Sequence, residues 1–443
     1  MQLPQDAKKL ISLLHSCGYK AYAVGGCVRD SLMGIAPKDI DIATSALPEE
    51  TESVLKNADI KYIETGIKHG TVTAVINHIP YEITTFRSDG EYKDNRHPDN
   101  VAFVKNIEND LSRRDFTVNA MAYNDSEGLV DCFGGREDLK NRIIRCVGDP
   151  DTRFNEDALR IMRALRFSSV LGFDIEKSTA ESVIKNRALL SNIAVERIYV
   201  ELTKLLLGDN CEEVLLKYRD VIAEIIPELK PSFDCEQNSP WHIYDVYTHS
   251  VKSVAVSPKK DYIRLAMLLH DSGKPFVKKT DSNGVDHFKT HPAVSFDIAK
   301  TVLKRLRVSR EVFDKATLLV KIHDEHIRLN KQSVKMWLKT LGEDMTLDFI
   351  DVKIADMKTH NPDKVADTCA LLGDIRKMCV QIIADNEPYK LSQLKVNGND
   401  LLTLGYYGSE IKKELDYLLD KVIEDENNNN REYLLSLAKN KTF

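Results

Sequence analysis

The periodicity of the sequence changes near residue 150, and this change constrains the fold more than any other feature. Before about residue 145, short segments rich in β-branched and aromatic residues alternate with helix-like segments. The strand-like segments are AYAV (21–24), DIDIA (39–43), GTVTAVI (70–76), YEITTF (81–86) and VAFV (101–104). From about residue 153 onward the apolar residues recur at helical spacing and the strand pattern is gone. We therefore expect an α+β protein, with a mixed α/β head followed by an all-helical remainder.

The charge of the chain is small in total but uneven along its length. The 443 residues are too many for one ordinary domain and enough for three or four. The formal net charge of −6 divides into −9 for residues 1–240, +9 for residues 241–340 and −6 for residues 341–443. A mildly acidic total does not exclude a nucleic-acid partner, because local patches matter more than the sum.

The cysteines and the hydropathy indicate a cytoplasmic protein. The eight cysteines form no C-x-x-C pair and are spread over the whole chain, which favours reduced thiols over a disulfide framework. No segment approaches the ~20 apolar residues of a membrane span, and the amino terminus carries charges where a signal peptide needs an apolar run. We expect no membrane partner.

Two adjacent glycines, Gly25 and Gly26, separate the first strand-like segment from a helix-like one. Because glycine has no side chain, the backbone can approach a ligand closely at such a turn. The N–H groups at the start of the following helix could then face a phosphate. A Gly-Gly pair alone also occurs in tight turns that bind nothing.

Asp39 and Asp41 stand two apart on a predicted strand, so both carboxylates leave the same face, while Ile40 and Ile42 point into the core. Neighbouring carboxylates repel each other unless a cation lies between them. Mg²⁺ prefers carboxylates together with phosphate oxygens, and Glu82 on another predicted strand could supply a third carboxylate. Such a set can clamp the attacking and leaving oxygens of a phosphoryl transfer. A D-x-D pair by itself also occurs at solvated strand ends.

Five segments together resemble the class II nucleotidyltransferase superfamily, which contains the tRNA CCA-adding enzymes and the bacterial poly(A) polymerases. They are VGGCVRDSLMGIAPKDIDIAT (24–44), TGIKHGTVTAV (65–75), YEITTFRSDGEYKDNRHPDNVAF (81–103), LSRRDFTVNAMAY (111–123) and RFNEDALRIMRALRFSSVLGF (153–173). They occur in the order of the family and cover nearly all of residues 20–173. TGIKHGTVTAV followed by EITTFR is closer to the CCA-adding branch than to the poly(A) branch.

The resemblance implies a palm-like mixed sheet and nucleotidyl transfer with Mg²⁺. By this resemblance Asp39 and Asp41 hold the catalytic metals and Glu82 is the third carboxylate. The substrates would be CTP, ATP and the 3′ end of tRNA, with release of pyrophosphate. The implied nucleotide-binding residues are Gly25, Gly26, Arg29, Arg114, Asp115, Asn119, Asp157, Arg160 and Arg163.

Asp157 and Arg160 are expected to select the base. On a helix opening at Glu156 they would lie on one face, and an acceptor beside a donor fork can read a base edge. In the family this E-D-x-x-R element replaces a nucleic-acid template, and Glu156 could fix Arg160 as an i,i+4 ion pair. An ordinary helix salt bridge is the other interpretation of the same residues. The segment 87–100 corresponds to the family's flexible loop, which helps to switch the pocket from CTP to ATP.

A set of histidines marks the helical body. His270 and Asp271 end an apolar helix-like run, and His249 lies on the preceding one. Imidazole and carboxylate are good ligands for a borderline divalent metal. These residues resemble the metal ligands of an HD-superfamily phosphohydrolase, with Asp356 as the best candidate for the last ligand and Asp351 as its rival.

His291 and His323 match the additional histidines of the active HD branch. The resemblance implies a divalent transition metal and phosphatase or phosphodiesterase activity. A degenerate body that serves only as a tRNA-binding scaffold is the alternative.

The whole chain is identified as a member of the CCA-adding branch with a fused HD domain. An A-adding enzyme or poly(A) polymerase is one alternative, and an HD phosphohydrolase with an RNA-selecting head is another. The expected domains are a nucleotidyltransferase head (1–145), an all-α neck with the nucleotide-selecting helix (146–228), an HD body (229–360) and a helical, tRNA-binding tail (361–443).

Overall fold

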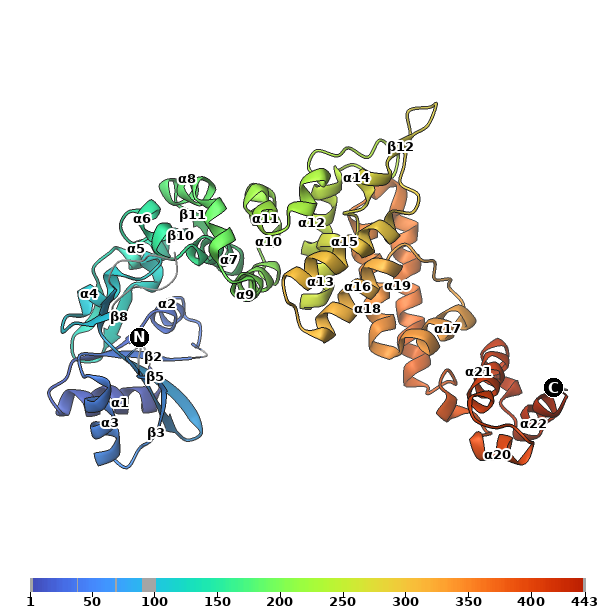
Figure 1. Ribbon diagram of the computed structural model, residues 1–443, viewed down its shortest axis with the longest axis horizontal. Helices are drawn as coiled ribbons and strands as arrows, with labels where there is room; N and C mark the ends of the chain where they lie inside the picture. The colour runs from blue at the N-terminus through green and yellow to red at the C-terminus, as the bar shows by residue number, and fades with distance from the viewer. Residues whose placement is uncertain (1–2, 38, 68–69, 90–100, 441–443) are drawn as a thin grey trace. The chain divides into compact units, whose positions relative to one another are not determined.

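The chain folds into two compact units, whose boundary falls between Pro227 and Glu228. The computed structural model describes residues 3–37, 39–67, 70–89 and 101–440. The first unit combines a sheet with helices, and the second is almost entirely helical (Figure 1). The expected α+β fold class is confirmed.

A mixed sheet of seven strands, counted over the described residues, forms the head. In spatial order the strands are β3 (Lys61–Gly66), β4 (Thr71–Ile76), β5 (Ile79–Thr85), β2 (Asp41–Thr44), β1 (Ala21–Val24), β8 (Met121–Asn124) and β9 (Gly128–Asp131). All neighbours are antiparallel except β2 and β5, which run parallel. A parallel pair needs a crossover, and here α3, β3 and β4 provide it.

The predicted strand around the D-x-D pair begins two residues later than expected. β2 starts at Asp41, and Asp39 precedes it. Ile40 and Ile42 are buried as expected, with 6% and 0% of their surface exposed. Inward and outward side chains still alternate along this segment. The apolar side chains pack under the sheet whether or not the backbone of Asp39 forms hydrogen bonds with a neighbouring strand.

Within the described part of the chain, three short strand pairs lie outside the main sheet. Antiparallel β6 (Arg87–Asp89) and β7 (Val101–Phe103) flank residues 90–100. Parallel β10 (Ile143–Ile144) and β11 (Asp174–Ile175) fasten the helices after the head. In the second unit β12 (Lys279–Thr280) and β13 (Asp286–His287) form a hairpin.

Helices cover the sheet and build the rest of the first unit. They are α1 (Gln5–Ser16), α2 (Gly26–Leu32), α3 (Pro48–Asn57), α4 (Ile107–Ser112), α5 (Gly135–Asn141), α6 (Pro150–Glu156), α7 (Leu159–Leu171), α8 (Lys177–Lys185), α9 (Val195–Leu206), α10 (Cys211–Lys217) and α11 (Arg219–Ile225), with the 3₁₀ turns η2 (Thr117–Asn119) and η3 (Arg187–Asn192). α7 packs on α9, and both helices bury apolar side chains, among them Ile161, Leu165 and Leu202.

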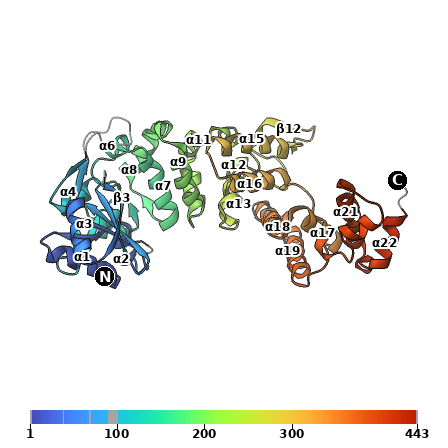
Figure 2. The same cartoon turned by 60° about the horizontal axis from the view of Figure 1, so that its bottom comes forward.

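The second unit is a helical bundle followed by a small helical end. Its elements are η4 (Pro227–Ser232), α12 (Val246–Val256), α13 (Asp261–Leu269), α14 (Lys274–Val277), α15 (His291–Arg305), α16 (Arg310–Ile322), α17 (Lys331–Leu341), α18 (Glu343–Lys358), α19 (Pro362–Ala384), η5 (Leu391–Gln393), α20 (Gly398–Thr403), α21 (Ser409–Glu424), η6 (Glu426–Asn428) and α22 (Arg431–Lys439). Figure 2 shows α12, α13, α16 and α18 grouped in the bundle.

The second unit begins with an irregular segment and ends in a small core of its own. After η4 the chain runs without regular structure to Asp245, whose carboxylate caps α12 through the N–H groups of Tyr247 and Thr248. At the other end, α20, α21 and α22 enclose a core of their own around Leu418 and Leu434.

Candidate functional site

The glycine turn after β1 brings the backbone against an arginine from another segment. Gly25 has a φ of +75°, which residues with side chains rarely adopt. A Cβ atom on Gly25 would lie 2.8 Å from a terminal nitrogen of Arg114. A Cβ atom on Gly26 would make only an ordinary contact, 3.6 Å from Arg29. Position 25 therefore requires glycine if Arg114 is to keep its place.

The three predicted catalytic carboxylates gather at the β2–β5 pair. Asp41 of β2 stands directly opposite Glu82 of β5 in the parallel register. Loss of solvent raises the pKa of Asp41, and the charges of Glu82 and Asp39 raise it further, while Arg114 opposes them. Crowded carboxylates of this kind favour a bound cation, and their oxygen donors fit Mg²⁺.

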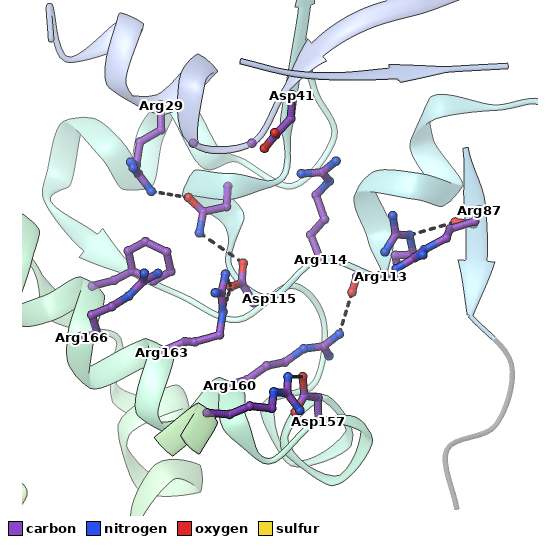
Figure 3. Close-up of a pocket in the computed structure, with 15 residues that line it drawn as sticks. Arg29, Asp41, Arg87, Arg113, Arg114, Asp115, Asp157, Arg160, Arg163 and Arg166 are labelled. Atoms are coloured by element: carbon purple, nitrogen blue, oxygen red, sulfur yellow. Dashed lines mark hydrogen bonds and ion pairs between the residues drawn. The ribbon is translucent and has the colours of Figure 1, made fainter. Parts of the chain in front are cut away.

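Asp41 lines a cavity of about 630 Å³ that is rich in arginine. Figure 3 shows Arg114 reaching toward Asp41 across this cavity. Eight arginines of the described chain contribute to its wall: Arg29, Arg87, Arg113, Arg114, Arg160, Arg163, Arg166 and Arg197. Gly25, Gly26, Asp115, Asn119, Asp157 and Phe167 complete the lining. A wall with this excess of guanidinium groups suits a polyanion such as a triphosphate.

A buried carboxylate, Asp115, organises one side of the cavity. Its Oδ2 accepts two hydrogen bonds from Arg163, from Nε at 2.8 Å and from a terminal nitrogen at 2.5 Å. Its Oδ1 accepts one from Asn119 at 3.2 Å, and the Asn119 side-chain oxygen accepts one from Arg29 at 2.7 Å. Burial alone would raise the pKa of Asp115, but Arg163 lowers it to about 2. The ionised carboxylate thus fixes three of the predicted nucleotide-binding side chains.

Phe167 of α7 supports three arginines of the wall. The guanidinium carbons of Arg166, Arg29 and Arg163 lie 3.9, 5.2 and 5.3 Å from its ring centroid. Cation–π contacts of this kind position the guanidinium groups, and the arginines keep their full positive charge for a ligand. Phe167 is not evident from the sequence, because an aromatic residue at helical spacing is usually a core residue.

Asp110 of α4 was also missed, although it anchors the opposite wall. It is 1% exposed and accepts hydrogen bonds from Arg113 at 2.7 Å and from Arg114 at 3.1 Å. Burial opposes its ionisation, but these two arginines hold the pKa of Asp110 below its usual value. The backbone N–H of Arg87 in β6 contacts the same carboxylate at 3.3 Å. The D-x-x-R-R spacing is the sequence signal that could have found this residue.

The predicted single helix through Glu156 and Arg160 is wrong. α6 ends at Glu156, Asp157 is extended with φ −136° and ψ 102°, and α7 begins at Leu159. The chain breaks here because Oδ1 of Asp157 accepts the N–H of Leu159 at 3.1 Å, a local bond that competes with the helix.

The ion pair between Glu156 and Arg160 is present despite the break, at 2.7 Å. Arg160 also donates to the carbonyl groups of Arg153 at 3.2 Å and of Arg113 at 2.9 Å. Asp157 pairs with Arg197 of α9 at 3.2 Å. Asp157 and Arg160 both face the cavity, as Figure 3 shows, whereas Arg197 was not anticipated because it lies 40 residues away.

The expected flexible loop falls mainly on residues 90–100, which lie outside the described residues.

A second group of candidate ligands gathers in the helical bundle. Nε2 of His249 lies 2.9 Å from Oδ1 of Asp356 and 3.5 Å from Oδ2 of Asp271. Nε2 of His270 lies 3.3 Å from the same oxygen of Asp271. Asp356 therefore joins the cluster, whereas its rival Asp351 pairs with Arg376 at 2.6 Å.

His291 and His323 face the other oxygen of Asp271. Their Nε2 atoms lie 3.2 and 3.7 Å from Oδ1. Nδ1 of each donates to a backbone carbonyl, of Phe288 and of Val320. Such bonds fix the tautomer and leave Nε2 as the metal-binding nitrogen.

The donor set in the bundle fits a divalent metal. Nε2 of His270 is buried without a hydrogen-bond partner among the described residues, while its Nδ1 donates to the Met267 carbonyl at 2.7 Å. Burial disfavours a charged imidazole, yet Asp271 and Asp356 raise the pKa of His270 to about 10. The two carboxylates therefore favour a positive charge beside Nε2 of His270.

Three further side chains at this cluster were not anticipated from the sequence. Lys274 pairs with Asp271 at 2.7 Å. The rings of His360 and His242 lie 4.6 Å apart, and that of His360 is 4.9 Å from the ring of His249. His242 comes from the irregular segment before α12, where no pattern indicates a contact with the bundle.

Three family models match successive parts of the chain. They describe a poly A polymerase head domain (residues 21–145), a probable RNA and SrmB- binding site of polymerase A (residues 172–233) and an HD domain (residues 242–359).

A solved structure covers almost the whole chain. The crystal structure of the Bacillus stearothermophilus CCA-adding enzyme in complex with CTP is 30% identical, with a TM-score of 0.75 over 99% of this chain and 97% of that chain. The chain belongs to the CCA-adding enzyme family. The Thermotoga maritima CCA-adding enzyme complexed with tRNA is 20% identical with a TM-score of 0.60, a likeness of fold.

Curated CCA-adding enzymes match a shorter stretch more strongly. That of Ligilactobacillus salivarius is 48% identical over 221 residues, which cover 49% of this chain and 54% of the relative. That of Geobacillus thermodenitrificans is 49% identical over 211 residues, 48% of this chain and 51% of the relative. The chain thus spans about half the length of the curated relatives it matches.

The head domain model spans Asp39, Asp41 and Glu82, and the HD domain model spans His249, His270, Asp271 and Asp356. Both domains depend on metals. Among the helices of the described residues, none has the length and apolarity to cross a membrane.

Proposed function

We propose that this chain adds or repairs the 3′-terminal CCA of tRNA, using CTP and ATP without a nucleic-acid template. The observation that carries the proposal is the parallel register of Asp41 and Glu82 at an arginine-lined cavity beside the Gly25 turn. Carboxylates for a metal and guanidinium groups for phosphates are the parts that nucleotidyl transfer requires. The names of the relatives favour CCA addition over an A-adding enzyme or a poly(A) polymerase.

Asp39, Asp41 and Glu82 would hold Mg²⁺ in the head. The chemistry that Mg²⁺ supplies when bound is neutralisation of the triphosphate and activation of the tRNA 3′-hydroxyl. Arg29 and Arg114, at the glycine turn, bind and orient the triphosphate, so that pyrophosphate can leave on the side of the arginine wall. These roles match a structure in which Arg114 already approaches Gly25.

Asp115 and Asn119 position the nucleotide rather than react with it. Asp115 holds Arg163 and Asn119, and Asn119 holds Arg29, so a shift of one would move the others. These four side chains, of Asp115, Asn119, Arg163 and Arg29, are hydrogen-bonded within this set and also line the cavity. A prebuilt set of this kind favours the reacting geometry because little ordering is left for the binding step.

Asp157 and Arg160 select the base in this proposal. The three hydrogen bonds of Arg160 to described residues occupy three of its five N–H groups. Two donors thus stay available for a base edge, beside the acceptor oxygens of Asp157. Arg197 on one side and Glu156 on the other hold the pair in place.

Asp157→Ala is expected to impair the choice between CTP and ATP more than the rate of addition. A hydrogen bond to a charged group contributes ~1.5–3 kcal/mol, so the ratio of kcat/KM for correct and incorrect nucleotides should fall by about tenfold or more. Single-nucleotide incorporation on transcripts ending at C and at CC measures this ratio. Glu181→Ala, an exposed carboxylate on α8, is the matched control. Unchanged selectivity in Asp157→Ala would show that this residue does not read the base.

The proposal as a whole is tested with tRNA transcripts ending at the discriminator base, at C and at CC. Incorporation of both CTP and ATP supports CCA addition. ATP alone on the CC form indicates an A-adding enzyme, and long A-tails on unrelated RNA indicate a poly(A) polymerase. Absence of incorporation together with release of phosphate indicates a phosphohydrolase with an RNA-selecting head.

We further propose that the HD cluster binds a divalent transition metal and hydrolyses phosphate esters. The converging donors of His249, His270, Asp271 and Asp356 support this activity, since mixed imidazole and carboxylate sets suit such metals. His270→Ala is expected to abolish metal-dependent hydrolysis of a phosphomonoester and of a 2′,3′-cyclic phosphate, and to leave CTP incorporation unchanged. Hydrolysis that survives this change would place the activity outside the cluster.

The division into a head (1–145), neck (146–228), HD body (229–360) and tail (361–443) is part of the proposal. The unit boundary after Pro227 and the separate core around Leu418 support it.

Residues 241–340 carry an excess of positive charge that suits tRNA phosphates. Exposed lysines of this segment, at positions 279, 289, 304 and 321, are candidates for contact with those phosphates. The eight cysteines carry free thiols, which supports a reducing compartment such as the cytoplasm.

A further inference from the structure

His360 stands beside the HD cluster without belonging to the ligand set that the motif implies. It follows Asp356 by four residues, just after the end of α18, and its side chain is buried. A ring nitrogen of His360 lies within 4.8 Å of ligand atoms of both His249 and Asp356. His249 also groups with His270 and Asp271, so His249 joins the group that contains His360 to the pair implied by the HD motif.

The hydrogen bonds of His249 and His360 indicate which ring nitrogen of each can bind a cation. Nδ1 of His249 is engaged by the hydroxyl of Thr359 at 3.1 Å, so His249 offers Nε2. Nδ1 of His360 lies 2.9 Å from the backbone oxygen of Asp356, which can only accept. Nδ1, which also lies 3.7 Å from Oδ1 of Asp356, therefore carries the proton, and Nε2 is the nitrogen of His360 that has a lone pair for a metal.

The position of His360 is held from two sides. Its ring packs against the rings of His249 and His242, with centroids 4.9 and 4.6 Å away. The next residue, Asn361, ties this chain turn to the segment before α12, with hydrogen bonds to the carbonyls of Trp241 at 2.8 Å and Pro240 at 3.1 Å. A donor that is ordered in advance costs little entropy when it binds a metal.

We propose that His360 is a further protein ligand of the HD metal, together with His249, His270, Asp271 and Asp356. This inference rests on the proposed HD metal site. Three imidazoles and two carboxylates form a donor set that suits Co²⁺, Ni²⁺, Mn²⁺, Fe²⁺ or Zn²⁺, whereas Mg²⁺ prefers oxygen ligands and retains its waters. The site in the bundle should therefore select a transition cation, in contrast to the carboxylates of the head.

The test measures Co²⁺ binding to the full chain, with the head silenced by Asp39→Asn and Asp41→Asn. Isothermal titration gives the affinity, and the visible absorption of Co²⁺ reports its ligands, so neither measurement depends on enzyme activity. His360→Ala removes the imidazole. His360→Asn keeps a donor near the Nδ1 position, which can still reach the Asp356 carbonyl, but lacks the distal nitrogen. His287→Ala removes an exposed histidine that pairs with Asp281 outside the cluster and is the control.

We expect both His360 variants to bind Co²⁺ at least about tenfold more weakly, with an altered absorption band, and His287→Ala to match the parent. Thermal unfolding without metal verifies that His360→Asn is folded. If His360→Asn binds Co²⁺ like the parent, His360 serves only the helix end and the inference is overturned. Mg²⁺ that competes with Co²⁺ at equal concentration would overturn the predicted selectivity.

His270→Ala separates failure of this inference from failure of the site beneath it. If the parent binds Co²⁺, His270→Ala does not, and His360→Asn does, then only the role of His360 is wrong. If the parent binds no Co²⁺, or His270→Ala binds it unchanged, the proposed HD metal site is itself wrong.

Discussion

Asp41→Asn is expected to abolish the incorporation of CTP and ATP while hydrolysis at the HD cluster continues. Asp41 lies opposite Glu82 and lines the arginine-rich cavity, so this change removes one of the carboxylates that would hold Mg²⁺. Metal stabilisation of the transition state is worth several kcal/mol, which corresponds to a loss of about 10³-fold or more in kcat. Single-turnover addition of labelled CTP to a transcript ending at the discriminator base measures the effect.

The matched control for this experiment is Asp125→Asn, an exposed carboxylate of the head that pairs with Lys8. It should add nucleotides at the normal rate. Simultaneous loss of addition and hydrolysis in Asp41→Asn would contradict the assignment of the two activities to two separate clusters.

Asp115→Asn is expected to cause the largest loss of stability in the first unit. The carboxylate is buried and receives two hydrogen bonds from Arg163. Its removal takes away the nearer counter-charge of Arg163, which then keeps only the more distant Glu201 at 3.9 Å. Breaking a buried ion pair costs about 3–5 kcal/mol. Urea unfolding monitored for the first unit should show this loss, and nucleotide affinity should fall because Arg29, Asn119 and Arg163 lose their alignment. An unchanged unfolding midpoint would contradict the role of Asp115 as the organiser of the wall.

The same pair predicts a dependence of stability on pH. The pKa of Asp115 is about 2 in the folded protein, against 3.8 for an ordinary aspartate side chain. Because the folded value is the lower one, the stabilisation is complete above about pH 4 and is lost as the pH falls toward 2. The difference corresponds to about 2 kcal/mol. The decrease in stability between pH 5 and pH 2 should therefore be smaller in Asp115→Asn than in the parent, while Asp174→Asn, at an exposed site on β11, should behave like the parent.

The strands of the head were predictable because their pattern is local. Ile40 and Ile42 are buried and Asp41 faces the cavity, as the alternation around the D-x-D pair requires. The same local logic failed at Asp157, where helical spacing continues through the segment but the aspartate binds the N–H of Leu159 and interrupts the helix. The spacing of apolar residues indicates which residues are buried. It does not reveal a hydrogen bond from a side chain to the backbone that competes with the helix.

The histidines of the bundle illustrate the same limit. His270 and Asp271 were noticed because they are adjacent and end an apolar run. His360 and His242 were not, because single histidines carry no pattern and their contacts with each other span 118 positions of sequence.

The order of residues therefore determined the local chemical groups: the glycine turn, the Asp39–Asp41 pair and the adjacent His270 and Asp271, each defined over a few neighbouring positions. The tertiary structure decided which of these groups meet. Only the parallel pairing of β2 with β5 brings Glu82 opposite Asp41, and only the packing of α9 beside α7 brings Arg197 to Asp157. The physical reason is that local patterns follow from the geometry of a helix or a strand, whereas contacts between distant segments depend on how those elements pack.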